Sequence, residues 1–260
     1  MISVIIPNFN GSEFLPKLLS NLKTIIHPNF EIILVDNGST DNSLQIFQSL
    51  ITRHCQLITN SSNLGFAAAV NQGINAATNP YVCLLNNDLI LSPNWFNLII
   101  DSIKKHPNVA CFCGTVKNIN GSTIESQGIT FDWSGKCLQI KKQPAGIIWG
   151  SSAAAVVYRQ DILKKIGLFD EKYFAYLEDV DLAFRLHQKH YQTLLIPNAI
   201  SYHLGGGTSN KMGNFRAKQT FKNWIYFIKK NYTIKQKIVH LPSILIERLH
   251  NFSYLLKSTI

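Results

Sequence analysis

The feature that most constrains this chain is a regular alternation of short apolar runs with amphipathic stretches over its first third. The apolar runs predict buried strands at 2–6, 31–36, 56–59 and 81–85. Between them, apolar residues recur at helical spacing, as in Leu15, Leu18, Leu19 and Leu22. Strands that alternate with helices are joined by right-handed crossovers, which predicts an α/β protein with a parallel sheet covered on both faces.

Polar residues follow each predicted strand of this region. The clusters are Pro7-Asn8, Asp36-Asn37, the segment 60–63 and Asn86-Asn87-Asp88. Ligands of open α/β sheets bind at the carboxyl ends of the strands. We therefore expect these clusters to meet at one binding site.

The middle of the chain, 108–158, is rich in strand-forming residues and glycine turns. Short helices are predicted over 161–167 and from Glu178 onward. Three consecutive glycines at 205–207 predict a mobile loop, because glycine has wide backbone freedom.

The net charge of +10 is concentrated at one end of the chain. Residues 211–260 hold ten Lys/Arg and one acid, whereas 1–210 hold fifteen Lys/Arg and fourteen acids. The charged segment also carries apolar stripes at helical spacing, such as Leu245, Leu249, Phe252 and Leu256. Basic amphipathic helices suit an anionic membrane surface. The alternative is that these helices pack on the domain and solvate their lysines. Charge confined to such a tail argues against nucleic-acid binding.

The cysteine content and the N-terminal sequence indicate the cellular compartment. The five cysteines form no CxxC motif, which predicts free thiols in a reducing compartment. The start MISVIIPNFN has no basic residue before its apolar run, so no signal peptide is expected. No apolar stretch reaches the ~18 residues of a membrane span. A cytoplasmic protein, peripheral to the inner face of the membrane, is predicted.

Two strand-end acids are candidates for ligand binding. Asp36 is placed to accept hydrogen bonds from a nucleoside, or to close an Asx turn. Asp88, with Asn86, offers oxygen ligands to a hard divalent cation that already carries phosphates, or caps the following segment. The usual dinucleotide glycine fingerprint and the P-loop are both absent from the sequence.

A second set of candidates follows in the sequence YLEDVD. Glu178, Asp179 and Asp181 lie in the first turn of a predicted helix, where the macrodipole favours carboxylates. A partly buried carboxylate there also suits a general base. Arg185 lies four residues after Asp181, so that pair is predicted to be structural. His203 ends a strand beside the glycines, and it is either structural or a ligand to a metal.

Six segments together resemble the inverting glycosyltransferases of family 2, which have the GT-A fold. They are VIIPNFNG, VDNGSTD, NLGFAAAVNQG, LLNNDLILSPNW, GLFDEKYFAYLEDVDLAFR and YHLGGG, within residues 1–230. Within the family they are most similar to the rhamnosyltransferase-like enzymes of bacterial surface polysaccharide assembly.

The resemblance implies an overall architecture. It predicts a Rossmann-like mixed sheet flanked by helices over residues 1–210, with a nucleotide-binding half (1–107) and an acceptor and catalytic half (108–210). The charge and apolar spacing described above, rather than the resemblance, predict a basic amphipathic helical extension over residues 211–260 that can associate with the membrane.

The resemblance also assigns roles to residues. Asp179 matches the catalytic base, with Glu178 beside it, and Asp88 and His203 match ligands of Mn²⁺ or Mg²⁺. Nucleotide binding is implied for Pro7, Asn8, Asn10, Asp36, Asn63, Gly65, Asn71, Asn86 and Asn87. The strand near the acceptor and donor sugar is matched by Trp149, Gly150 and Ser151.

The implied activity is inverting transfer of a sugar to a hydroxyl of a lipid-linked glycan. The predicted donor is dTDP-L-rhamnose, or otherwise a UDP-hexose. One alternative is a nucleotidyltransferase. The other is a non-catalytic relative that binds nucleotide sugars, and the two amides of Asn86-Asn87-Asp88 favour this second alternative. Neither the oligomeric state nor the acceptor can be read from the sequence.

Overall fold

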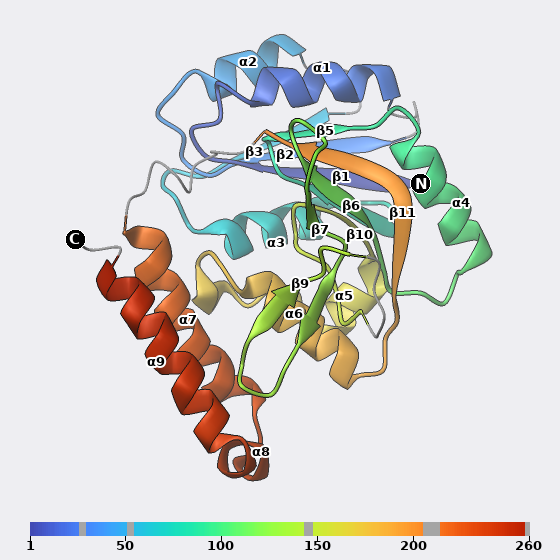
Figure 1. Cartoon of the computed structure of the whole chain (residues 1–260). Helices are drawn as coiled ribbons and strands as arrows, with labels where there is room; N and C mark the ends of the chain where they lie inside the picture. The colour runs from blue at the N-terminus through green and yellow to red at the C-terminus, as the bar shows by residue number, and fades with distance from the viewer. Residues whose placement is uncertain (26–29, 51–54, 143–147, 205–213, 258–260) are drawn as a thin grey trace.

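The fold is built around one large mixed β-sheet (Figure 1). The structure is a computed structural model that describes residues 1–25, 30–50, 55–142, 148–204 and 214–257. Four parallel strands form one half, in the order β3 (Cys55–Thr59), β2 (Glu31–Asp36), β1 (Ile2–Asn8) and β4 (Tyr81–Leu85). The sheet continues through β10 (Ala155–Arg159), β6 (Cys111–Asn118), β11 (Thr193–His203) and β5 (Leu89–Leu91), and β7 (Ile124–Ser126) pairs with β6. Because β10 runs antiparallel to both β4 and β6, the sheet is mixed.

Helices cover both faces of this sheet, as predicted. On one face lie α1 (Leu15–Ile25), α2 (Ser43–Leu50) and α4 (Trp95–Lys105); on the other lie α3 (Phe66–Ala76), α5 (Gln160–Ile166) and α6 (Glu178–Gln188) (Figure 1). The strand side chains alternate between the two cores: Val4 and Ile6 join one, and Ile5 joins the other. This arrangement confirms the predicted α/β fold with a mixed sheet flanked by helices.

The predicted leucine stripe of the first helix is buried. Leu15, Leu18, Leu19 and Leu22 of α1 all face the core. Burying each of these side chains contributes roughly 1.5–3 kcal/mol before entropy costs. That burial holds α1 over the sheet and fixes the loop before it, which carries part of the binding site.

A third core cluster joins the C-terminal helices to the domain. The helix α7 (Phe215–Asn231) buries Trp224 and Phe227 against α6 and the hairpin of β8 (Ile129–Phe131) and β9 (Cys137–Gln139). A short 3₁₀ helix, η1 (Glu171–Tyr173), leads into the same cluster. The alternative in which this helix packs on the domain therefore holds for α7.

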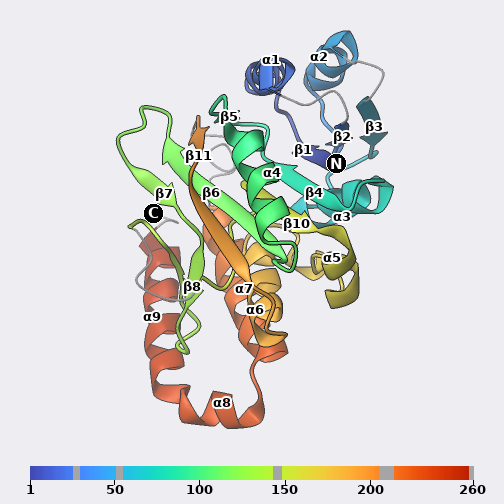
Figure 2. The ribbon, with the colours of Figure 1, turned by 90° about the vertical axis from the view of Figure 1, so that its right-hand side faces the viewer.

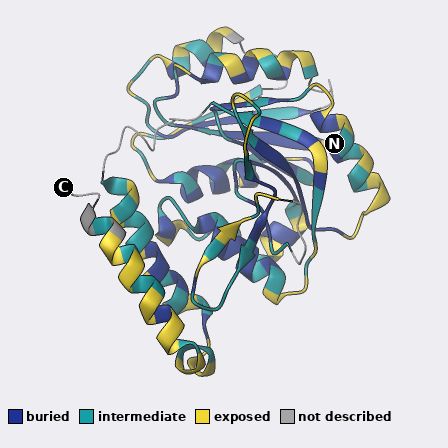
Figure 3. Cartoon of the chain, viewed as in Figure 1, coloured by how far each residue is buried: buried dark blue, intermediate teal, exposed yellow. Residues whose placement is uncertain are grey.

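The last two helices are more exposed. The short α8 (Ile234–Val239) links α7 to α9 (Leu241–Lys257), which lies alongside α7 (Figure 2). Exposed apolar side chains line α8 and α9: Ile234, Ile238, Val239, Leu241, Leu245, Ile246, Leu249 and Phe252. This surface appears as a largely exposed outer face in Figure 3. Across the described residues, no helix is long and apolar enough to cross a membrane. The loop predicted at the glycines 205–207 lies outside the described residues.

Candidate active site

A pocket of about 330 Å³ opens where the polar strand ends meet. One wall comes from the ends of β1 and β4 and from the loops after β2 and β3. A second wall comes from segments 152–154 and 174–176, from Glu178 and Asp179, and from the first residue of α7. Most of the predicted site residues line it: Pro7, Asn8, Asn63, Gly65, Asn86, Asn87, Asp88, Glu178, Asp179 and His203.

A chain of hydrogen bonds runs across the first wall. The register of β1 and β2 places Asn8 opposite Asp36. The Asn8 Nδ2 donates to Asp36 Oδ1 at 3.0 Å, and the Asn87 Nδ2 donates to Asn8 Oδ1 at 2.8 Å. The Ser39 backbone N–H completes the set by donating to Asp36 Oδ2 at 3.0 Å. Asp36 is buried and outside the described pocket lining, so it orients Asn8 in the pocket.

A second amide network holds the loop after β3. The Asn37 Nδ2 donates to Asn63 Oδ1 and to the Gly65 carbonyl, both at 3.0 Å. Gly65 has a φ of +90°, and it lies so close to Phe174 that a Cβ there would stand 2.5 Å from the Phe174 carbonyl oxygen. Asn37 lines the pocket, as expected for the polar cluster Asp36-Asn37 after the second strand, although the sequence assigned it no specific role.

Asp88 and His203 are brought together by pairing of β5 with β11, which sets His203 opposite Leu89. The His203 Nε2 lies 3.1 Å from Asp88 Oδ2, and its Nδ1 lies 2.9 Å from Glu125 Oε2. The hydrogen bond with Asp88, reinforced by both carboxylate charges, raises the pKa of His203 to about 9. Glu125 comes from β7, and no sequence signal marked it, because only the tertiary fold brings that strand beside His203.

The part of the pocket around Asp88 and His203, called the Asp88 corner below, contains buried oxygen atoms without partners among the described residues. Asp88 Oδ1 and Asn86 Oδ1 have no hydrogen-bond partner among the described residues. Unpaired buried oxygens are costly unless a ligand or ion satisfies them. Nor do the described residues contain a cluster of three or more His, Cys, Asp or Glu able to hold a metal by themselves. Any cation here would therefore need further oxygen ligands from the substrate.

Glu178 and Asp179 line the same pocket from the start of α6. Asp179 Oδ1 accepts from the Val180 N–H at 2.8 Å, and Oδ2 accepts a longer bond, 3.4 Å, from the Ala153 N–H. Burial raises the pKa of Asp179. Burial first, and then the charge of Asp179, raise the pKa of Glu178 well above its ordinary value. Glu178 Oε2 has no partner among the described residues, whereas Asp179 accepts two backbone N–H bonds. Asp179 is therefore the first of the pair to ionise.

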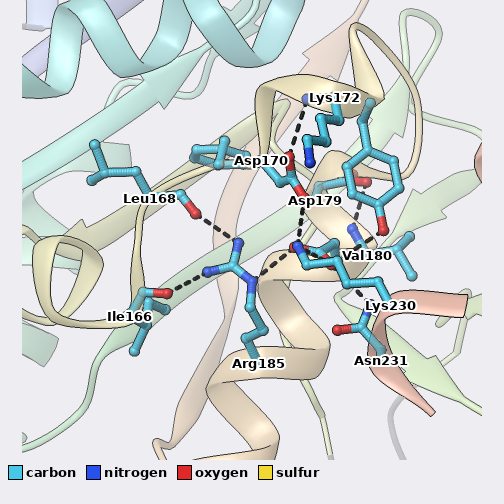
Figure 4. Close-up of polar contacts among 12 residues, drawn as sticks. Ile166, Leu168, Asp170, Lys172, Asp179, Val180, Arg185, Lys230 and Asn231 are labelled. Carbon is cyan, nitrogen blue, oxygen red and sulfur yellow. Dashed lines mark hydrogen bonds and ion pairs between the residues drawn. The ribbon is translucent and has the colours of Figure 1, made fainter. Parts of the chain in front are cut away.

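Asp181 lies outside the described pocket lining and is held in an ion-pair network. Arg185 Nε donates to its Oδ2 at 2.7 Å, which confirms the predicted structural pair. Lys230 Nζ lies 2.9 Å from Oδ1, and Asn231 Nδ2 donates to the same atom at 2.8 Å. Figure 4 shows Lys230 and Asn231 reaching this network from α7, while Arg185 also donates to the carbonyls of Ile166 and Leu168. Sequence spacing could reveal Arg185 but not Lys230, which lies 49 residues away.

Three residues predicted to bind nucleotide are not part of the described pocket lining. They are Asn10, Asp36 and Asn71. The Asn10 Oδ1 accepts from the Thr40 N–H at 2.8 Å. The Asn71 side chain exchanges hydrogen bonds with the Phe169 backbone, at 2.9 and 3.1 Å, and so joins α3 to the segment before η1. Direct contact of these residues with a nucleotide stays a prediction.

The residues predicted near the sugars, Trp149, Gly150 and Ser151, also fall outside the described pocket lining. Trp149 stacks on His187 with ring centroids 3.8 Å apart. A Cβ on Gly150 would lie 2.3 Å from the Cβ of Ala183, so this glycine allows segment 148–151 to approach α6. Ser151 is buried beside the pocket segment 152–154 and donates to the Ser152 carbonyl. Their contact with sugar stays a prediction as well.

Aromatic side chains form the wall beside the two acids. Phe174 and Tyr176 meet Phe215 of α7 with ring centroids 6.0 and 6.5 Å apart. Phe174, Tyr176 and Leu177 all have positive φ, between 61° and 70°. Such backbone conformations cost on the order of 1–3 kcal/mol each for residues other than glycine, and they persist only where surrounding contacts hold them. The sequence shows no signal for Phe215 as a pocket residue.

Comparison with known proteins identifies the family. The sequence profile described as "Glycosyl transferase family 2" matches residues 3–167. The chain belongs to this family. The match covers the strand-end wall of the pocket and ends before Glu178, Asp179 and His203, so the family match does not address those three residues.

Similar proteins agree with this family assignment. The chain is 24% identical over 257 residues to the poly-beta-1,6-N-acetyl-D-glucosamine synthase of Staphylococcus epidermidis. This alignment covers 97% of the present chain and 62% of the synthase. The present chain therefore spans less than two thirds of the length of that relative.

Two solved structures share the fold. The mannosyltransferase PcManGT from Pyrobaculum calidifontis, in complex with GDP-Man and Mn²⁺, superposes with a TM-score of 0.69 at 14% identity. The superposition covers 99% of this chain and 73% of the mannosyltransferase chain. The structure of S. aureus TarS 1–349 in complex with UDP-GlcNAc has a TM-score of 0.66 at 18% identity. The superposition covers 96% of this chain and 72% of the TarS chain.

Proposed function

We propose that this chain transfers a sugar from a nucleoside-diphosphate sugar to an acceptor hydroxyl, with inversion at the anomeric carbon. The observation that carries the proposal is the position of Asp179. It shares one pocket with the Asp88–His203 corner and with the strand-end asparagines. A single in-line displacement needs a base for the acceptor, a site for the diphosphate and a site for the nucleoside. We assign these roles to Asp179, to the Asp88–His203 pair and to the strand-end asparagines.

In this mechanism Asp179 accepts the proton of the acceptor hydroxyl while that oxygen attacks the anomeric carbon. The bond from that carbon to the diphosphate breaks on the opposite face, and the electron pair leaves with the diphosphate. General-base assistance of this kind typically contributes ~10²- to 10⁴-fold. The raised pKa of Asp179 suits the task, because a base is most effective when its pKa approaches the working pH.

A divalent cation fits the Asp88 corner. Asp88 Oδ1 and Asn86 Oδ1 are buried oxygens in need of a partner, and hard cations such as Mg²⁺ or Mn²⁺ prefer oxygen ligands. Asp88 would hold the ion together with oxygen atoms of the donor, and His203 would join them once its imidazole had lost the proton that Asp88 and Glu125 stabilise. When bound, the cation supplies Lewis-acid neutralisation of charge on the diphosphate. With two amides in Asn86-Asn87-Asp88, we expect weak metal binding in the absence of nucleotide.

We assign the first wall of the pocket to the donor nucleotide and the second to the acceptor. The proton of the acceptor must reach Asp179, so the acceptor ring has to lie on the side of Asp179, beside Phe174, Tyr176 and Phe215. Residues 1–107 then form the nucleotide half and 108–210 the acceptor half. Phe215 adds a contribution from the C-terminal segment 211–260.

The identity of the donor sugar is inferred from the sequence resemblance and from the names of the matched proteins. The resemblance in the sequence favours dTDP-L-rhamnose, whereas the names of the matched proteins include N-acetylglucosamine and mannose. We infer that the donor is one of UDP-GlcNAc, dTDP-L-rhamnose or another UDP-hexose, and we place UDP-GlcNAc first. The acceptor is proposed to be a surface polysaccharide or its lipid-linked precursor.

A panel of nucleotide sugars tests the function. The full chain is mixed with UDP-GlcNAc, dTDP-L-rhamnose, UDP-glucose and GDP-mannose plus Mn²⁺, and the melting temperature and nucleoside-diphosphate release are measured. A donor at a hundredfold excess over its Kd stabilises the protein by about 2.7 kcal/mol. Stabilisation with release supports transfer, and stabilisation without release supports the non-catalytic alternative. Release of pyrophosphate from a nucleoside triphosphate would support the nucleotidyltransferase instead.

We also propose that the exposed apolar face of α8 and α9 contacts an anionic membrane. Large apolar side chains are exposed along it, and residues 211–260 carry a net charge of +9. The test is co-sedimentation with vesicles of phosphatidylserine and phosphatidylcholine. The double variant Leu245→Gln/Leu249→Gln should bind at least about tenfold more weakly, since burying each leucine contributes roughly 1.5–3 kcal/mol.

The matched control for this test is Ile119→Gln in the turn between β6 and β7, which changes another exposed apolar residue outside α8 and α9. It should bind the vesicles as the wild type does. Equal binding by all three proteins, or no binding by the wild type, would count against a membrane surface at α8 and α9. A concentration-dependent dimer that Leu245→Gln/Leu249→Gln dissolves would assign the face to a second copy.

A further inference from the structure

Segment 173–177 is a short strained loop in which successive carbonyl groups all find partners. The Phe174 carbonyl accepts from the Ala67 N–H at 3.4 Å, at the start of α3. The carbonyls of Tyr173, Ala175 and Tyr176 are instead held from α7. This loop carries the aromatic wall of the pocket and leads directly into Glu178 and Asp179.

One side chain of α7 serves those three carbonyls. The Nδ2 atom of Asn223 lies 3.0, 2.9 and 2.6 Å from the carbonyl oxygens of Tyr173, Ala175 and Tyr176. Because a carboxamide has two N–H bonds, the three acceptors share them. Asn223 is 1% exposed, so water does not compete for these contacts.

The orientation of this amide is itself fixed. Gln219, one turn earlier on α7, donates from Nε2 to Asn223 Oδ1 at 3.2 Å and to the Tyr173 carbonyl at 2.8 Å. The donors of Asn223 are thereby turned toward the loop and its acceptor toward Gln219. Further along α7, Lys230 and Asn231 bind Asp181, two residues beyond Asp179. The helix thus holds the chain on both sides of Asp179, through the loop carbonyls before it and through the Asp181 carboxylate after it.

We propose that Asn223 is a positioning residue for sugar transfer: its amide keeps the 173–177 loop in its strained form and so sets the place of Asp179 and of the acceptor wall. The inference rests on the proposed function of Asp179. Three residues with positive φ in four positions would relax to ordinary backbone conformations without such a restraint. Relaxation of the loop would move the residue that follows it, the base.

Two kinds of measurement test this role. Asn223→Leu is nearly isosteric and removes both N–H donors, and the control Phe227→Leu removes packing from the same buried side of α7 without touching the loop carbonyls. Hydrogen exchange of a peptide spanning 171–182 should be at least about tenfold faster in Asn223→Leu than in Phe227→Leu, since buried hydrogen bonds set the local opening equilibrium. Equal exchange rates in the two variants would overturn the inference.

The second measurement is turnover of the nucleotide sugar that the panel selects, with water as acceptor. Asn223→Leu should lower kcat by about 10- to 100-fold relative to Phe227→Leu, because a displacement near 1 Å can cost ~10²-fold. KM for the donor should stay within about threefold, because the opposite wall binds the nucleotide. A kcat equal to that of Phe227→Leu would overturn the inference.

A milder variant covers the case in which Asn223→Leu does not fold. Gln219→Leu removes one donor to Tyr173 and the restraint on Asn223, and it should speed exchange of the same peptide and lower kcat by about three- to tenfold. Unchanged exchange in Gln219→Leu would contradict the role of this pair. A wild-type chain that turns over no nucleotide sugar would count against the proposed function alone, since the exchange measurement does not depend on activity.

Discussion

Replacing Gly65 by alanine should disturb the binding pocket for two reasons, its backbone conformation and the lack of space for a methyl group. Gly65 has φ +90° and ψ 163°, a region of backbone conformation that is essentially restricted to glycine. Its missing side chain also leaves room for the neighbouring loop. An added Cβ would lie 2.5 Å from the Phe174 carbonyl oxygen and 2.9 Å from its carbonyl carbon.

The two effects can be given separate magnitudes. The backbone conformation costs alanine on the order of 1–3 kcal/mol. Relieving contact with a backbone carbonyl, which cannot rotate away, costs typically 1–3 kcal/mol more. We expect Gly65→Ala to lower the free energy of unfolding by about 3–5 kcal/mol. For a domain of this size each kcal/mol lowers the melting temperature by roughly 2–4 °C, so the loss is about 6–20 °C.

The matched control is Gly167→Ala. Gly167 has a similar φ of +92°, but nothing lies within 4 Å of its added Cβ. It should cost only about 1 kcal/mol, or roughly 2–4 °C. Thermal denaturation of both variants measures the difference, and nucleotide-sugar binding to Gly65→Ala at low temperature should also weaken because Gly65 itself belongs to the wall proposed to bind the nucleotide. Equal melting temperatures for the two variants would refute the argument that Gly65 is required for close approach to Phe174.

Three further predictions concern the chemistry of the site. Asp179→Asn should lower kcat by ~10²- to 10⁴-fold with little change in donor binding by calorimetry, and a near-wild-type rate would contradict its role as base. Glu178→Gln should be more stable than the wild type at neutral and alkaline pH. The raised pKa of Glu178 means that its contribution to stability is complete below its ordinary value of 4.5 and is lost as pH rises toward the folded pKa. Melting curves should therefore diverge above about pH 4.5, and parallel pH profiles would show that Glu178 is not buried uncharged. EDTA should abolish turnover and Mn²⁺ restore it, and full activity in chelator would exclude the metal.

Local sequence patterns predicted the first half of the fold well. The spacing of Leu15, Leu18, Leu19 and Leu22 predicted a helix with that buried face, and the structure confirms it. The pair of Asp181 and Arg185 could be predicted for the same reason, because residues four apart share a helix face. Polar residues after parallel strands were predicted to converge, and Asn8, Asn63 and Asp88 do line one pocket.

Long-range contacts could not be predicted in this way. Glu125 reaches His203 through β7, and Phe215 enters the pocket from a helix that sequence analysis placed in a basic tail. Trp149 stacks on His187 outside the described pocket lining, a contact that the sequence did not indicate, and its position near the sugars stays a prediction. Such contacts depend on how separate elements pack, and periodicity within one element carries no record of its neighbours.

The sequence by itself determined the family, the α/β class and the strand-end positions of the polar residues, because these follow from local periodicity and short motifs. Tertiary structure decided which of those residues share the pocket and which support it from outside. It also decided the role of α7, whose Asn223 and Lys230 bind the loop and helix on either side of Asp179. The physical reason is that a buried carbonyl or carboxylate needs a partner from somewhere in the fold, and here that partner lies about 50 residues away in the sequence.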